Sequence, residues 1–289
     1  MAPTIARVFP RKTKASPTDK LAFFGPPPMF LPDISEVHVS VAFTYDISHA
    51  EFLAAQWERI APVKMGGPAY NQPGDVFQPG MYLKPGYVIT SRGCPNKCWF
   101  CAVWKREPRL LELPIENGWN ILDDNLLACS EEHIRSVFNM LARQPVRAEF
   151  TGGIEAKRLQ KWHVDLLASI KPKRVFFAYD EESDWEPLEQ ACKLIWAAGF
   201  KSSSHTFRCY VLAGYPNDTI ESAERRCRRA CTIGLMPMVM IYRDKEGRRD
   251  HEWIKWGWRW SRPACIGAMC GGPVKQPLTT AAMPAGISN

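Results

Sequence analysis

Residues 174–213, RVFFAYDEESDWEPLEQACKLIWAAGFKSSSHTFRCYVLA, decide the fold class of this chain. They open with an apolar run at 174–180 and end with another at 208–213, and each has the length of a buried strand. Between the runs, residues 185–198 carry apolar side chains at helical spacing, and Gly199 follows, a residue that commonly ends helices. A strand, a helix and a strand in succession predict two parallel strands joined by a crossover helix.

The same rhythm continues in both directions along the chain. Further strands are expected at 82–91, 119–122, 147–150 and 237–242, with helices at 130–141, 162–170 and 219–232. Right-handed crossovers curl such a sheet toward a barrel, and six β/α units are fewer than the eight of a complete barrel. We therefore expect an α/β fold in which residues 81–245 form a partial (β/α)6 barrel similar to a TIM barrel.

Three cysteines lie close together where the first of these strands ends. Cys94, Cys98 and Cys101 have the spacing C-x3-C-x2-C within residues 90–101. A loop with this spacing can give three thiolates to an iron–sulfur cluster and leaves one iron open for another ligand. A structural zinc site usually needs four Cys or His ligands, and the loop contains no histidine. The spacing favours an iron–sulfur site over a zinc site or a chance grouping.

The motif, with Phe100 directly before its last cysteine, resembles the signature of the radical S-adenosylmethionine (radical SAM) superfamily. The resemblance implies that Cys94, Cys98 and Cys101 hold a [4Fe-4S] cluster. It implies that the amino and carboxylate groups of S-adenosyl-L-methionine (SAM) bind the fourth iron. It also implies reductive cleavage of SAM to a 5′-deoxyadenosyl radical, which abstracts hydrogen from a substrate, and an electron donor similar to flavodoxin or ferredoxin.

Acidic and glycine-rich turns follow the other expected strands, at the sheet edge where parallel α/β folds bind ligands. Each turn alone is more commonly a helix cap or a tight turn, but several at one edge favour a cofactor pocket. An acidic side chain would pair with the SAM ammonium, and Asp124 and Glu155 are both open for this role. The candidate cofactor-binding residues are Phe100, which would lie along the adenine by resemblance, and Asp123, Asp124, Asn125, Gly152, Gly153, Glu155, Tyr179, Asp180 and Gly214.

The residues before the barrel divide into two parts. Residues 1–35 are rich in Pro, Lys and Arg, and Gly25 followed by three prolines opposes regular structure, which predicts a basic extended arm. Residues 36–80 read as a strand, a helix and a strand. This β-α-β extension resembles the last part of the cobalamin-binding domain of some radical SAM enzymes, here truncated. The cobalamin-ligating D-x-H-x-x-G of that family is absent, so cobalamin is not expected. A cobalamin-assisted radical SAM methyltransferase is the alternative within the same class, and the missing motif disfavours it.

Residues 246–289 form a segment rich in tryptophan and arginine, in which four tryptophans at 253–260 alternate with basic residues. Such side chains can stack on bases and pair with phosphates. A helix that buries the tryptophans and exposes the bases is the favoured alternative. Cys265 and Cys270 could help to bind an auxiliary cluster or act on a substrate. An interpretation from another class is a non-catalytic iron–sulfur or zinc protein that binds nucleic acid.

The totals are consistent with a globular protein of 289 residues with 46% hydrophobic and 23% charged residues. No apolar run approaches the roughly 20 residues that cross a bilayer. Ten cysteines in a chain without an export signal favour a reducing compartment, so we expect a cytoplasmic protein without membrane association. The net charge of +7 favours an anionic partner. A nucleotide or RNA would fit, and a peptide or another small molecule also remains open as the substrate.

Overall fold

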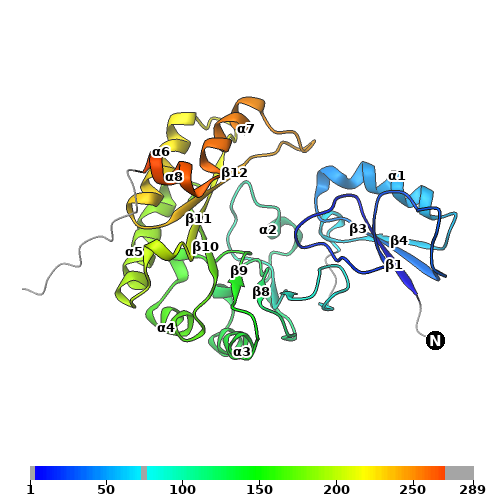
Figure 1. The fold of residues 1–289 in the computed structure, drawn as a ribbon, viewed down its shortest axis with the longest axis horizontal. Helices are drawn as coiled ribbons and strands as arrows, with labels where there is room; N and C mark the ends of the chain where they lie inside the picture. The colour runs from blue at the N-terminus through cyan, green and yellow to red at the C-terminus, as the bar shows by residue number, and fades with distance from the viewer. Residues whose placement is uncertain (1–3, 73–76, 271–289) are drawn as a thin grey trace, which may run out of the picture. The chain divides into compact units, whose positions relative to one another are not determined.

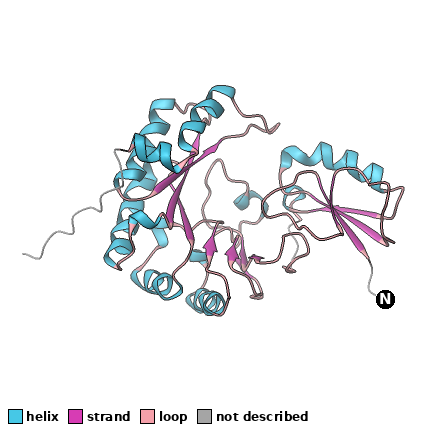
Figure 2. Cartoon of the chain, in the orientation of Figure 1, coloured by secondary structure: helices cyan, strands magenta, loops and turns pink. Residues whose placement is uncertain are grey.

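The computed structural model describes residues 4–72 and 77–270, which fall into two compact units. The first unit is drawn from residues 1–154, 170–173 and 243–249, and the second from residues 155–169, 174–242 and 250–289. The path of the chain can be followed in Figure 1, and its helices and strands in Figure 2.

A four-stranded parallel sheet opens the first unit, in the order β2-β1-β3-β4. Helix α1 (Ile47–Trp57) joins β3 to β4, lies against the sheet in Figure 1 and buries Leu53 and Trp57. The core of this sheet draws its buried residues from positions 6–61. The predicted β-α-β extension is thus confirmed as β3, α1 and β4. The strands are β1 (Ile5–Phe9), β2 (Ala22–Phe24), β3 (Glu36–Ser40) and β4 (Val63–Gly66).

The extended arm predicted for residues 1–35 is wrong for its described part, because β1 and β2 lie within it. Ala6 and Val8 on β1 are fully buried, and β1 pairs with both β2 and β3. Arg7 makes this short apolar run look polar in sequence. In the fold its guanidinium is buried, donates to the carbonyls of Gly80 and Met81, and pairs with Asp19. Tertiary partners that sequence periodicity cannot reveal therefore make the strand possible.

A second parallel sheet contains the strands predicted for the β/α region, in chain order β5-β8-β9-β10-β11-β12. The α/β class and the parallel sheet are thereby confirmed. The predicted first strand is cut to two residues, because Ser91–Arg92 leaves this sheet to form a separate antiparallel pair. The strands are β5 (Tyr87–Val88), β8 (Asn120–Ile121), β9 (Glu149–Phe150), β10 (Arg174–Ala178), β11 (Phe207–Ala213) and β12 (Met236–Ile241).

Helices alternate with these strands, as the rhythm predicts. Ser130 caps α3 by accepting a hydrogen bond from the His133 N–H, and Gly199 after α5 has the left-handed φ of +87°. No described helix is long and apolar enough to cross a membrane. The remaining helices are α2 (Val103–Arg106), α3 (Glu131–Ala142), α4 (Lys161–Ile170), α5 (Trp185–Ala197), α6 (Ile220–Thr232), α7 (His251–Gly257) and α8 (Pro263–Met269).

The described part of the tryptophan-rich segment agrees in part with the structural alternative. Trp256 and Trp260 are buried, whereas Trp258 is 67% exposed. Cys270, expected as a possible ligand beside Cys265, instead forms a disulfide with Cys231 at the end of α6. Residues 271–289 of the segment lie outside the described residues.

Candidate functional site

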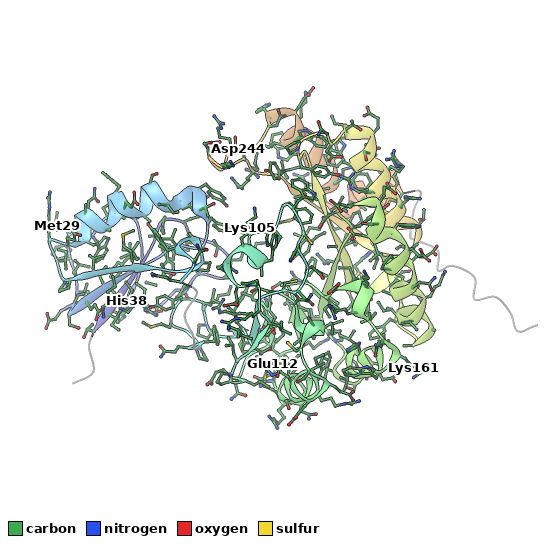
Figure 3. The ribbon with its side chains drawn as sticks, turned by 180° about the vertical axis from the view of Figure 1, so that it is seen from behind. Met29, His38, Lys105, Glu112, Lys161 and Asp244 are labelled. Atoms are coloured by element: carbon green, nitrogen blue, oxygen red, sulfur yellow. A yellow bond between two sulfur atoms is a disulfide. The ribbon has the colours of Figure 1, made fainter. Side chains whose placement is uncertain are left out.

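The three motif cysteines lie on the loop of a small antiparallel hairpin in the first unit. Strand β6 (Ser91–Arg92) pairs with β7 (Leu111–Glu112), and the loop between them contains the cysteines and α2. Figure 3 labels Lys105 on α2 and Glu112 on β7. Gly93 begins the loop with φ +83°, and a Cβ at this position would lie 1.9 Å from the carbonyl oxygen of Arg109. Only glycine fits where the two sides of the hairpin approach this closely.

Asp123, two residues after β8, connects that strand to the start of the hairpin. Its carboxylate accepts from the Thr90 N–H at 2.6 Å, the Thr90 hydroxyl at 2.5 Å and the Ser91 hydroxyl at 2.8 Å. The residue is only 1% exposed, and burial raises its pKa despite these donors. Asp123 is therefore a positioning residue that fixes the strand end from which the cysteine loop starts.

Asp124 points to the cysteine loop itself. One carboxylate oxygen accepts from the Gly93 N–H at 2.9 Å, and the other lies 3.5 Å from the Arg106 guanidinium on α2. Its side chain is 17% exposed, so it is less enclosed than Asp123. Burial lowers the pKa of nearby Arg92, while Asp124 acts in the opposite direction. A carboxylate with two basic neighbours thus lies beside the first cysteine.

The sulfur atoms of Cys94 and Cys101 accept weak hydrogen bonds. The Asn125 amide donates to Cys94 Sγ and the Val103 N–H to Cys101 Sγ, each at 3.4 Å. Burial raises the pKa of Cys101, and Cys94 and Asp124 act in the same direction. Cys98 is exposed, and its carbonyl accepts from the Cys101 N–H and the Trp104 indole.

The side chains of the loop are of the chemical type that binds an iron–sulfur cluster, but they are not gathered closely enough to hold one. Three cysteines outside any disulfide and sulfur-directed N–H donors are what such clusters use. Among the residues that the structure describes, however, no three Cys, His, Asp or Glu side chains lie together closely enough to hold a metal ion. Ligation by all three cysteines therefore requires the loop to close around the cluster.

Two further candidate residues lie next to this site. Gly152, after β9, packs so closely that a Cβ would lie 2.5 Å from the Asp123 carbonyl oxygen. Gly153 has φ +95°, a value that glycine adopts readily. Gly152 therefore packs against the acidic turn after the second predicted strand. Phe100 packs edge-to-face against Trp99, with ring centroids 5.4 Å apart.

The other candidates belong to the second unit. Glu155 pairs with Arg158 at 2.7 Å on its own turn. Tyr179 is fully buried, and its hydroxyl contacts Arg229 and Glu182. These three side-chain contacts are local to the second unit.

Asp180 and Gly214 lie at the ends of neighbouring strands. Asp180 accepts from the Leu212 N–H at 2.8 Å, and burial raises its pKa to about 6. Gly214 has φ +79° and lies under the Trp253 ring, which a Cβ would approach to 2.7 Å. A partly protonated carboxyl near neutral pH therefore lies beside a tight turn at this strand edge.

Sequence reasoning missed the polar residues that hold the site together. Thr90 and Ser91 precede the motif and bind Asp123, and Arg106 follows it and pairs with Asp124. A Thr-Ser pair at the end of an apolar strand, with an Asp at the end of the next, was the available signal.

No protein-family model matches the chain, and no curated protein matches it.

Proposed function

We propose that this chain is a radical SAM enzyme in which Cys94, Cys98 and Cys101 hold a [4Fe-4S] cluster. One observation carries the proposal: all three residues of the acidic turn after β8 bind the cysteine hairpin. Asp123 binds the strand before the motif, Asp124 binds Gly93, and Asn125 binds Cys94. Three consecutive side chains directed at the hairpin that carries the three cysteines are more than a helix cap or a turn requires.

The proposal assigns each of these side chains a role. Asn125 directs an N–H at Cys94, the kind of hydrogen bond that tunes a cluster sulfur. Asp124 is favoured for the SAM ammonium, because its carboxylate adjoins the first cysteine. Glu155 is less favoured, since Arg158 pairs with it at 2.7 Å, more closely than Arg106 approaches Asp124, at 3.5 Å. The cluster, when bound with SAM, would supply the electron that cleaves SAM to a 5′-deoxyadenosyl radical.

The finer fold and setting belong to the same proposal. Six parallel strands in chain order are the arrangement from which a partial (β/α)6 barrel is built, and this order supports one here. Asp180, with its raised pKa, and Gly214 lie at strand ends, where such folds bind ligands. A flavodoxin-like or ferredoxin-like donor and a reducing compartment such as the cytoplasm would suit the cluster. The Cys231–Cys270 disulfide is the observation that opposes that compartment.

The test is anaerobic reconstitution of the full chain with iron and sulfide, followed by dithionite and SAM. Wild-type protein should bind about four irons and release 5′-deoxyadenosine. Cys98→Ala should lose both properties. Cys265→Ala is the matched control, because both cysteines are exposed and neither forms a disulfide, and it should keep both properties. If Cys98→Ala kept its iron and its 5′-deoxyadenosine, or if wild-type protein bound zinc alone, the proposal would be wrong.

A further inference from the structure

A cavity of about 370 Å³ lies in the first unit at the carboxyl edge of the four-stranded sheet. Its residues follow three of the four strands: Pro10 and Arg11 after β1, Phe43 after β3, and Gly67 after β4. The volume is within the range of small-molecule sites. None of the cysteines of the proposed cluster site lines it.

The strand order explains why a cavity forms at this edge. In the order β2-β1-β3-β4, the chain leaves β1 toward β2 on one side and leaves β3 toward β4 on the other. The two connections diverge, and a crevice opens between the ends of β1 and β3. Open parallel sheets bind ligands at such a switch point. The lining residues at positions 9–13 and 42–46 belong to these two connections.

Arg11 is held in this crevice in a fixed orientation. Its Nε and one terminal nitrogen bind the Asp46 carboxylate at 2.9 and 2.7 Å, and its guanidinium lies 5.4 Å from the Tyr45 ring centroid. The Asp46 side chain is 9% exposed, whereas that of Arg11 is 44% exposed. Asp46 occupies the N-cap position of α1 but makes no side-chain cap hydrogen bond there. Its carboxylate instead binds Nε and Nη2 of the Arg11 guanidinium, and the third nitrogen, Nη1, takes no part in this contact.

The other walls define what the cavity can accept. Large apolar side chains line it, among them Phe9, Phe43, Met65, Phe77, Leu83 and Ile89. The charged lining residues are Arg11, Lys64, Arg92 and Asp46. Arg11 pairs with Asp46, and Lys64 pairs with Glu36, which lies outside the lining. His38, labelled in Figure 3, adds a polar edge and contacts the Tyr82 hydroxyl at 2.7 Å. An apolar cavity with a fixed guanidinium in its wall suits a ligand with an apolar body and an anionic end.

We propose that this cavity binds a small organic anion with an apolar body and one carboxylate or phosphate group, which Arg11 holds. The apolar body would lie among the apolar walls, and the anionic group would accept hydrogen bonds from the guanidinium. The proposal goes beyond the cluster chemistry and does not depend on it.

Titration calorimetry on the full chain tests the proposal with two pairs of probes. Adenosine 5′-monophosphate is compared with adenosine, and indole-3-carboxylate with indole. In at least one pair, the anion should bind at least tenfold more tightly than its neutral parent. A preference in the first pair identifies a phosphate ligand, and a preference in the second identifies a carboxylate. If neither anion binds more tightly than its parent, the proposal fails.

Two variants locate the binding. Arg11→Met/Asp46→Asn removes the guanidinium and its partner together, so that no buried charge is left unpaired. Gly66→Leu fills the cavity, because a Cβ there meets only the Gln72 amide oxygen, at 3.5 Å. Each should weaken binding of the anion at least tenfold.

Matched controls separate loss of the site from loss of the fold. Arg135→Met/Glu131→Gln removes an exposed ion pair on α3, and Gly267→Leu fills open space on α8. Both should bind the anion as wild type does, and circular dichroism should show folded protein for all four variants. Binding that survives in both site variants overturns the proposal. If one site variant is unfolded, the other decides the outcome.

Discussion

Asp123 and Asp124 show how two identical neighbouring residues acquire different roles. Asp123 turns inward and uses both carboxylate oxygens on Thr90 and Ser91, so it is almost inaccessible. Asp124 turns toward Gly93 and Arg106 and keeps part of its surface exposed. The sequence predicts that this turn belongs to the site. It cannot predict which carboxylate faces inward, because that depends on hydroxyl and N–H donors supplied about thirty residues earlier.

At the residue scale, Asp180 should make stability depend on pH. Its carboxyl has an ordinary pKa of 3.8, and burial raises this to about 6 in the fold. Between about pH 4 and pH 6 the unfolded chain has released this proton while the folded chain keeps it. The Asp180 contribution to the free energy of unfolding therefore falls as pH rises through this window. At about 1.4 kcal/mol per pH unit, the loss approaches about 3 kcal/mol by pH 7.5.

Asp180→Asn should remove this dependence, because asparagine does not titrate and still offers an oxygen to the Leu212 N–H. Urea denaturation should find the variant more stable than wild type at pH 7.5 and close to it at pH 4. Asp165→Asn on the exposed face of α4 serves as the control for loss of a carboxylate. A gain in Asp180→Asn that is the same at both pH values would contradict the prediction.

At the scale of elements, the sequence predicts what depends on periodicity and misses what depends on distant partners. The strands of the β/α region lie in the predicted order, because each is an apolar run next to an amphipathic helix. Strand β1 was missed because buried Arg7 interrupts its pattern. The β6–β7 hairpin was missed because two-residue strands carry no periodicity.

Helix α6 also differs from what its composition suggests. Its four arginines at 225–229 read as a solvated face, yet the Arg226 side chain is only 2% exposed. Its guanidinium binds both carboxylate oxygens of Asp218, which is 1% exposed, and donates to the Leu212 carbonyl at 2.8 Å. Asp218 in turn accepts from the Gly214 N–H. This pair therefore ties α6 to the turn after β11.

We predict that Arg226→Ala lowers the free energy of unfolding by about 3–5 kcal/mol, because it leaves the Asp218 carboxylate buried without its partner. Arg225→Ala is the matched control on the same helix. That side chain is 54% exposed and lies 3.7 Å from Glu182, so its loss should cost less than about 1 kcal/mol. Chemical denaturation measures both values, and equal costs for the two variants would show that the buried pair does not stabilise the element.

At the scale of the whole molecule, the four-stranded sheet has a core of its own. Its buried residues, among them Val39, Leu53 and Trp57, all come from positions 6–61. Leu167 on α4 belongs to the second unit and is also fully buried. Because the contacts of the first core are local in the chain, we expect it to open without opening the second unit.

Hydrogen exchange followed by mass spectrometry tests this independence with one core truncation in each place. Leu53→Ala should cost about 2–5 kcal/mol and speed exchange in β1, β3 and β4, while amides of α4 and β10 keep wild-type rates. Leu167→Ala should do the reverse at a similar cost. Both residues are fully buried leucines on helices, so each variant controls for the other. If either substitution sped exchange to the same degree in both sets of amides, the chain would unfold as one cooperative body, and the four-stranded sheet could not respond to a ligand independently of the second unit.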